Sequence, residues 1–387
     1  MVVRSAFTFI GLACHARQNM ITATNTCNAT TDLLGFRRVA AQVNYRWWQK
    51  EMLWFDLPET IASTATDAGN AWLMALLPLA FELGQSLKIN TPVDAGLLQN
   101  AEELQRIWVG WFPKKRPIRI MAEPAANTAE AGNRTGCFFT AGVDSFFSAL
   151  HFDATGGGQK VNDLIYVWGY DIPLENRSAF DGKMKALARI GSQLEKTIIP
   201  VATNLRQTRI GKLDWATVMH GQALGAVGLL MGGRFKTILV SASLSPGDMR
   251  ACGTHLLTTT QMSSSRLKFL DYGSDFYRYD KVAFIASNTV ALENLHVCWV
   301  GRNEINCGRC EKCYRTLLSL ELLNCRQRAT SFPQEGFSLE NLQQLKLPTN
   351  LAAPLFEEIS RAARQINRLD VVVAVDGFLA ANRSLNK

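Results

Sequence analysis

The sequence lacks a G-x-x-x-x-G-K-[ST] run, so the phosphate-binding loop of the usual P-loop proteins is excluded. It also lacks an apolar run long enough to cross a bilayer, because the apolar stretch from Trp72 to Phe81 is short and contains Pro78. Internal repeats, low-complexity segments and long runs of basic residues are absent as well. We therefore expect a globular protein without a membrane span or a repetitive architecture.

The composition is that of a globular protein with room for two domains or one enlarged domain. Its 387 residues are 47% hydrophobic and 19% charged, with a net charge of +8 and a pI near 9.1. The basic excess favours an anionic partner such as a nucleotide or RNA. Direct nucleic-acid binding is not expected, because no extension combines Lys and Arg with aromatic residues.

Residues 1–130 are expected to form an accessory α+β region. The predicted elements are strands within 36–54 and at 117–121, helices at 68–87 and 94–111, and a linker at 123–134. The helix at 68–87 is expected to carry one apolar face, formed by Trp72, Ala75, Leu76, Leu79, Ala80 and Leu83.

From Gly136 onward, short apolar segments alternate with helical patterns. The predicted strands are 136–140, 164–168, 196–201 and 236–241, and the predicted helices are 144–153, 178–194 and 216–231. This alternation predicts the α/β fold class for residues 131–330, with a mostly parallel sheet and helices on both faces. Residues 331–387 are expected to be a helical tail, with helices at 357–367 and 371–382.

The stretch from Cys137 to Phe147 is typical of a buried strand, a tight loop of small residues and the start of a helix. Backbone N–H groups of such a loop can surround an anion, and the helix dipole adds to the attraction. Ser145 can donate its hydroxyl to a phosphate, and Asp144 can hold Mg²⁺. An ordinary strand-to-helix turn with Asp144 as the N-cap is the alternative.

Three more loops follow strands of the predicted sheet, at 168–173, 203–206 and 241–248, and should meet the first loop at one edge. Arg206 can clamp a phosphate or carboxylate there, or form a surface salt bridge. His220 opens a helix rich in Ala and Gly and can be a structural histidine or a site residue. Asp275, Arg278 and Lys281 are spaced three apart, so they share a face if the segment is helical.

Four of the nine cysteines cluster as Cys298-x8-Cys307-x2-Cys310-x2-Cys313. Four thiolates so close together suit tetrahedral Zn²⁺, and Gly308 permits the tight turn that the spacing needs. An iron–sulfur cluster and buried thiols without metal are the alternatives. A closed four-cysteine site predicts a structural role. The next helix begins with Lys312 and Arg315, which can face an anion or solvent.

The loop Thr140-Ala141-Gly142-Val143-Asp144-Ser145 resembles the Ser-Gly-Gly-x-Asp-Ser loop of the ATP pyrophosphatases, the PP-loop family. Such a sheet followed by the four-cysteine pattern is similar to the 7-cyano-7-deazaguanine synthase branch of that family. The resemblance covers about residues 135–325. Residues 60–134 look like the extra N-terminal region of longer relatives of that synthase.

The resemblance implies an enzyme that uses ATP to adenylate the carboxylate of 7-carboxy-7-deazaguanine or a related base. Ammonia then displaces AMP to give an amide, and a second round gives the nitrile. The implied cofactors are ATP, Mg²⁺ and Zn²⁺. The implied catalytic residues are Asp144, Ser145 and Lys281, the cofactor-binding residues are Thr140, Ala141, Gly142, Val143, Asp144, Ser145, Trp168 and Gly169, and the metal ligands are Cys298, Cys307, Cys310 and Cys313. Arg206 is predicted as a further catalytic residue from its place after the third strand.

Other acceptors and reactions stay open. The acceptor can be ammonia or a protein amine that docks on the N-terminal region, as in longer relatives associated with antiviral defence. ATP-dependent tRNA modification is a second class, a nucleotide-binding scaffold without turnover is a third, and a homodimer is compatible with the sequence. An ATP-using enzyme with a thiolate metal site is expected in the cytoplasm, so the apolar start at 6–16 is interpreted as a strand and not as a signal peptide.

Overall fold

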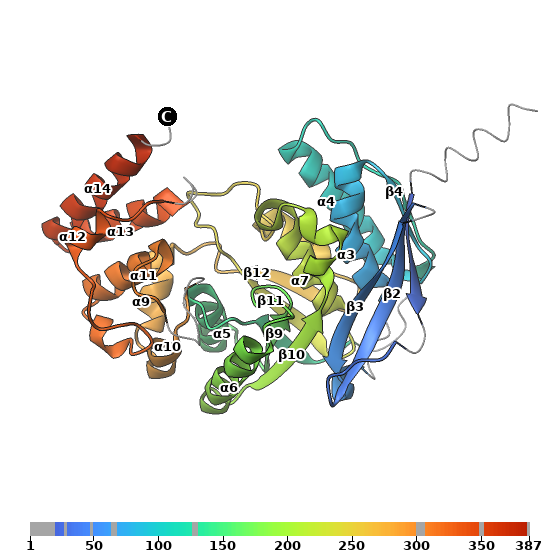
Figure 1. Ribbon diagram of the computed structural model, residues 1–387, viewed down its shortest axis with the longest axis horizontal. Coiled ribbons are helices and arrows are strands. Elements are labelled where there is room, and N and C mark those ends of the chain that lie inside the picture. The colour runs from blue at the N-terminus through green and yellow to red at the C-terminus, as the bar shows by residue number, and fades with distance from the viewer. Residues whose placement is uncertain are drawn as a thin grey trace, which may run out of the picture.

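One ten-stranded sheet forms the centre of the molecule, in the order β12-β11-β8-β9-β10-β3-β2-β1-β4-β6 (Figure 1). The computed structural model describes residues 20–26, 29–46, 49–62, 68–125, 131–298, 306–347 and 352–384. The strands are β1 Met20–Thr26, β2 Phe36–Arg46, β3 Gln49–Pro58, β4 Ser86–Ile89, β5 Val93–Asp94, β6 Ile120–Met121, β7 Pro124–Ala125, β8 Arg134–Phe138, β9 Asp163–Trp168, β10 Thr197–Thr203, β11 Phe235–Ser241 and β12 Lys268–Tyr272. The helices are α2 Glu59–Ala62, α3 Ala68–Leu83, α4 Ala95–Trp111, α5 Val143–Thr155, α6 Arg177–Gln193, α7 His220–Leu229, α8 Leu256–Thr259, α9 Arg278–Ile285, α10 Thr289–Asn294, α11 Glu311–Leu322, α12 Leu339–Leu342, α13 Ala353–Gln365 and α14 Leu369–Ser384.

The five strands from β8 to β12 are all parallel to one another, which confirms the predicted α/β class. The chain runs outward from β8 through β9 to β10 and then returns to β11 and β12 on the other side of β8. The strand order therefore reverses between β8 and β11. Ligands of open α/β sheets bind beyond the carboxyl ends of the strands at such a reversal. The loop at 140–145, which follows β8, lies at this point.

Helices cover both faces of the parallel part of the sheet, as predicted. On one face, Phe146 of α5 and Leu187 of α6 belong to a core that also receives side chains from the cysteine cluster. On the other face, Leu76 of α3 and Ala226 of α7 belong to a second core. The helix predicted at 216–231 begins with a π-helical turn, Trp215–Met219, before α7.

The N-terminal strands extend the same sheet, because β3 pairs antiparallel with β10. The last residue of β10 and the residue after it hold this junction together. Asn204 Oδ1 accepts from Trp54 N at 2.9 Å, and Thr203 Oγ1 donates to Trp54 O at 2.7 Å. The loop at 203–206 was expected at the ligand edge, but its first two side chains hold the accessory region to the sheet.

The helix α3 differs from its prediction in two ways. Every residue from Ala68 to Phe81 is buried, so the helix has no single apolar face. It packs against α4 and α7 as well as against β1 and β4 of the sheet. Leu83, predicted on the buried face, is 42% exposed. The helix ends at Leu83 because Gly84 takes a positive φ of 63° and β4 follows. The predicted strand at 117–121 is confined to β6, and the predicted strand at 6–16 lies outside the described residues.

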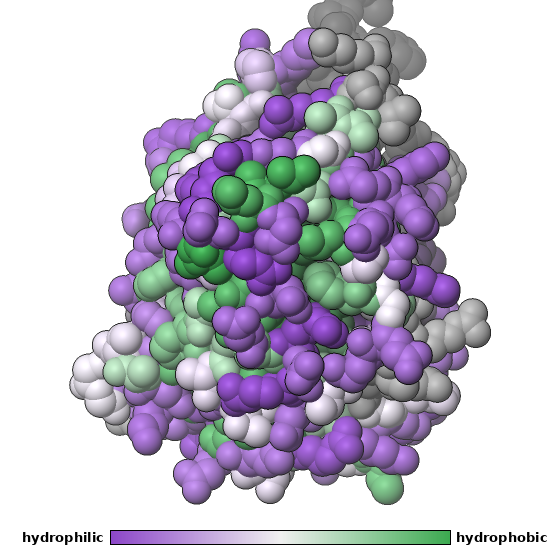
Figure 2. Space-filling model, turned by 90° about the vertical axis from the view of Figure 1, so that its left-hand side faces the viewer, coloured by the Kyte–Doolittle hydropathy of each residue, from purple (hydrophilic) through white to green (hydrophobic). Residues whose placement is uncertain are grey.

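The C-terminal helices α13 and α14 pack against α11 around a third core that includes Leu318, Phe356 and Phe378. Figure 2 shows the face on which these helices lie: it is mostly hydrophilic, with a hydrophobic patch in its upper half. Exposed apolar side chains of this part of the chain are Ile366, Leu369 and Val373. Among the helices in the described ranges, none has both the length and the apolarity needed to cross a bilayer.

Candidate anion site and metal centre

Hydrogen bonds between residues of the loop hold the turn between β8 and α5 in place. Ser145 Oγ donates to Gly142 O at 3.1 Å and accepts from Thr140 N at 3.4 Å, so the hydroxyl predicted to face a phosphate braces the loop. Ala141 adopts a positive φ of 60°, in the left-handed region that is uncommon for residues other than glycine. Gly142 is the N-cap of α5, so the interpretation of Asp144 as the N-cap is wrong: Asp144 lies in the first helical turn.

Asp144 is held between two cations of α9. Its Oδ2 accepts from Arg278 Nη1 at 2.6 Å, and its Oδ1 lies 3.5 Å from Lys281 Nζ. The predicted common face of Asp275, Arg278 and Lys281 is confirmed for Arg278 and Lys281, which both contact this carboxylate. It is wrong for Asp275, which lies in the turn before α9. Lys281 is only 2% exposed and also donates to Ala242 O at 2.8 Å, in the loop after β11. One carboxylate is therefore shared by two cations, which leaves a positive surplus beside the loop.

Burial alone would raise the pKa of the Asp144 carboxyl, but Arg278 and Lys281 reverse this and hold the pKa at about 2. The carboxylate is therefore charged throughout the physiological range. Burial raises the pKa of Asp271, at the end of β12, although Lys281 acts against this.

Two more cations approach the loop from α6 and α11. Lys183 Nζ donates to Thr140 O at 2.8 Å and lies 3.5 Å from His296 Nδ1. Arg315, 7% exposed, pairs with Glu311 at 3.1 Å, while its buried Nε has no hydrogen-bond partner among the described residues. Burial, together with the nearby Arg278, lowers the pKa of Arg315 to about 10. A buried guanidinium N–H without a partner is a donor available to an anion.

The loop after β9 is built around Gly169, whose φ of 100° excludes other residues in practice. A Cβ at this position would also lie 2.0 Å from Thr203 O. Trp168, predicted to flank an adenine, is buried: its ring stacks on Phe180 at 4.3 Å, and its Nε1 donates to Pro173 O at 3.0 Å. One face of the indole is therefore already occupied.

Arg206 braces the same loop. Its Nη1 donates to Tyr170 O at 2.7 Å, and its guanidinium lies 4.6 Å from the centre of the Trp215 ring. Burial lowers the pKa of His220 to about 4, against the opposing effect of Asp171, so the imidazole is neutral. Of the four predicted catalytic residues, the structure thus brings Asp144, Ser145 and Lys281 together and places Arg206 against Tyr170 and Trp215.

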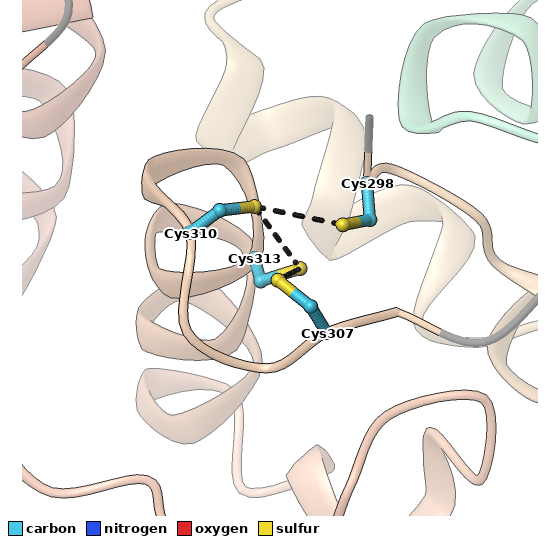
Figure 3. Close-up of side chains that lie close together, drawn as sticks. All are labelled: Cys298, Cys307, Cys310 and Cys313. Carbon is cyan, nitrogen blue, oxygen red and sulfur yellow. Dashed lines mark hydrogen bonds between the residues drawn. The ribbon is translucent and has the colours of Figure 1, made fainter. Parts of the chain in front are cut away.

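The four cysteines of the cluster converge from two arms of the chain, residues 295–298 and residues 306–313 (Figure 3). All four sulfur atoms lie within 4.8 Å of one another, and three of the sulfur–sulfur distances are 3.5 Å, 3.7 Å and 3.9 Å. Zn–S bonds of about 2.3 Å in a tetrahedron put ligand sulfurs about 3.8 Å apart. Disulfide sulfurs would be about 2.05 Å apart, so the four side chains are thiols or metal ligands. The cluster can therefore hold a metal ion such as zinc.

The local structure around the cysteines also suits a bound metal ion. Gly308 turns the chain with a φ of 70°, and Cys310 is the N-cap of α11. The contact between Cys310 and Cys313 lowers the pKa of Cys310 and raises the pKa of Cys313, so Cys310 is the thiol of this pair that more readily becomes the thiolate that binds metals. An iron–sulfur cluster that spreads its four sulfurs over several irons would need wider spacing than one ion.

Asn306 joins the two arms of the metal centre and is fully buried. Its Oδ1 accepts from Val297 N at 2.9 Å and from Cys298 N at 3.2 Å, and its Nδ2 donates to Leu295 O at 2.8 Å. One residue further along this arm, His296 N donates to Ala141 O at 2.8 Å. The metal centre is therefore hydrogen-bonded to the backbone of the loop.

Sequence reasoning missed Lys183 and Asn306. Lys183 lies on the apolar face of α6, between the buried Phe180 and Leu187. A lysine in such a face is a signal that the sequence does contain. Asn306 carries no comparable signal, since only the fold shows that its amide closes the gap between the two arms.

These observations establish an α/β protein with a large, mostly parallel sheet, a four-cysteine cluster able to hold a metal ion, and cations gathered at one loop. Comparison of the chain with family models, with curated proteins and with solved structures finds no match.

Proposed function

We propose that this chain is an ATP-dependent enzyme that adenylates the carboxylate of 7-carboxy-7-deazaguanine or a related base and passes the acyl group to an amine. One observation carries the proposal. A loop of small residues at the reversal of the sheet has Lys183, Arg278, Lys281 and Arg315 gathered beside it, and Asp144 is shared by two of these cations. This is the arrangement that a polyphosphate needs.

The chemistry requires charge neutralisation and positioning. A carboxylate oxygen attacks the α-phosphorus of ATP, the α–β bridging bond breaks, and pyrophosphate leaves. The cations beside the loop would stabilise the charge that develops on pyrophosphate. An amine then attacks the acyl carbon, AMP leaves with the bonding electrons, and the amine loses a proton. AMP is a better leaving group than an oxygen of the free carboxylate, so a neutral amine is a strong enough nucleophile to displace it.

Asp144 would change partners during this reaction. Its carboxylate is held by Arg278 and Lys281. Phosphate oxygens that draw these cations away would leave the carboxylate available for Mg²⁺, a hard cation that prefers oxygen ligands. Zn²⁺ in the four-cysteine cluster would have a structural role, because four protein ligands leave no open coordination position.

The test is release of AMP and pyrophosphate from ATP-Mg by purified protein given 7-carboxy-7-deazaguanine, with and without ammonium, followed by mass spectrometry of the base. AMP with an amide or nitrile product identifies ammonia as the acceptor. A base adenylate that ammonium does not consume indicates another amine, such as that of a protein. Absence of AMP in both reactions would contradict the deazaguanine proposal.

The variant Asp144→Asn should reduce the rate of AMP formation about a hundredfold, the effect expected when one preorganised charge is lost from a reacting centre. The matched control is Asp181→Asn, because Asp181 is a half-exposed aspartate paired with Arg177 at 2.8 Å on the outside of α6. The control should keep the rate of the original protein. Equal rates in all three proteins would show that Asp144 is not part of the site.

A further inference from the structure

One buried carboxylate of the C-terminal helices contacts the start of α9, the helix that carries two cations of the anion site. Glu358 of α13 is 5% exposed. Its Oε2 accepts from Arg278 N at 2.8 Å, and its Oε1 accepts from Ser245 Oγ in the loop after β11. Burial raises the pKa of the Glu358 carboxyl, although hydrogen bonds from Ser245 and from the backbone of Arg278 and Tyr279 act against this. Glu358 therefore occupies the place of an N-cap.

The helix α9 needs this contact because its own N-cap residue does not supply one. Tyr277 has the extended backbone of an N-cap, with φ −69° and ψ 152°, but makes no side-chain cap bond to described residues. The first N–H groups of a helix lack partners within the helix, and leaving them buried and unpaired is costly. A glutamate from another helix satisfies them here, and its charge also suits the helix dipole.

A second contact strengthens the same junction. Arg361, one turn after Glu358 on α13, lies 4.9 Å from the centre of the Tyr277 ring. The two contacts fix where α9 begins. Arg278 is the first residue of α9 and binds Asp144, and Lys281 follows three residues later. The position of both cations relative to the loop at 140–145 therefore depends on how α9 is held.

We propose that Glu358 is a positioning residue for the anion site: by capping α9 from α13, it holds Arg278 and Lys281 beside the loop. This inference rests on the proposed function only in taking polyphosphate as the ligand. It makes the C-terminal helices a part of the nucleotide site, although they contribute no group that touches the ligand.

The test compares binding of pyrophosphate and of ATP-Mg by titration calorimetry in the full-length chain. Glu358→Ala should weaken both affinities about fivefold to tenfold, the effect of losing one helix cap. Glu358→Gln keeps an acceptor oxygen for Arg278 N and should retain most of the affinity. The control Glu357→Ala removes the neighbouring exposed glutamate, which pairs with Arg383, and should bind as the original protein does.

A local cap distinguishes positioning from general destabilisation. Tyr277→Ser places an ordinary N-cap residue on α9 but also removes the ring that Arg361 contacts, so its own effect is measured in Tyr277→Ser alone. Adding Tyr277→Ser to Glu358→Ala should raise the affinity to that of Tyr277→Ser alone if capping is the role of Glu358. Unchanged affinity in Glu358→Ala, or no recovery in the double variant, would overturn the inference while leaving the anion site intact. If the original protein binds neither ligand, the proposed function and this inference fail together.

Discussion

At the scale of single residues, the pKa of Asp144 reflects the charges and the burial around its carboxyl group. Its pKa is about 2 in the folded protein, against 3.8 in the unfolded chain, because Arg278 and Lys281 favour the charged form more strongly than burial opposes it. A lowered folded pKa stabilises the native state above the unfolded pKa, and this stabilisation disappears as the pH falls toward 2. Above the unfolded pKa, the lowered pKa of Asp144 contributes on the order of 2 kcal/mol to the free energy of unfolding.

We therefore expect Asp144→Asn to lower the free energy of unfolding by about 2 kcal/mol at pH 7, with a difference that shrinks between pH 4 and pH 2. Urea denaturation of both proteins across this range measures it. Protonation of the cysteine thiolates affects both proteins equally, so it cancels in the difference. A difference that stays constant from pH 7 to pH 2 would show that the ion pairs do not set the stability.

Residue patterns predicted part of this site. The spacing of Arg278 and Lys281 placed both on one face, and the structure confirms that face. The role of Ser145 could not be foreseen, because a hydroxyl in a tight loop can face a ligand or close the loop, and the sequence contains both options. The sequence likewise does not show that the ring of Trp168, predicted to flank an adenine, stacks on Phe180.

At the scale of elements, the cysteine spacing predicted the metal cluster, since four thiols within sixteen residues can converge without help from the rest of the fold. The residue that holds the two arms together is not part of the cysteine pattern. Asn306 bridges the arm before Cys298 and the arm before Cys307 with hydrogen bonds in both directions. Groups behind metal ligands orient them and tune their affinity.

We expect Asn306→Ala to weaken zinc affinity about tenfold, because the two arms lose the group that orients them. Competition with a chromogenic chelator measures the affinity. Asn306→Asp is the matched comparison: it keeps the acceptor for Val297 N and Cys298 N but loses the donor to Leu295 O, so its affinity should lie between the two. Equal affinity in all three proteins would show that the arms are positioned without Asn306.

At the scale of the whole molecule, long-range pairing decides what local patterns cannot. Alternating strands and helices predicted a parallel sheet, but not the order in which β11 returns beside β8 and creates the reversal at the loop. Nor does any local pattern show that β3 continues the sheet from β10, because the fastening bonds join residues about 150 positions apart. The C-terminal helices reach the site in the same way, through Glu358.

The metal centre and the anion site are joined at this scale, and both arms take part. The arm before Cys298 holds Ala141 O through His296 N at 2.8 Å. The other arm continues as α11, which carries Arg315 toward Asp144. Metal removal should therefore disturb the loop as well as the cysteines, because both arms lose their common anchor.

We expect removal of zinc by a chelator to weaken pyrophosphate binding at least about tenfold, as when a ligand-orienting group is lost, and re-addition of zinc to restore it. Hydrogen exchange should rise in α11 and in residues 140–145 and stay low in β1, β2 and β4, which lie at the far end of the sheet. That pattern would show that the segments around the metal centre open locally while the rest of the protein stays folded. If the metal-free protein keeps its pyrophosphate affinity, the hydrogen bond from His296 to Ala141 does not transmit the state of the metal centre, and the cysteines serve only the stability of their own segment.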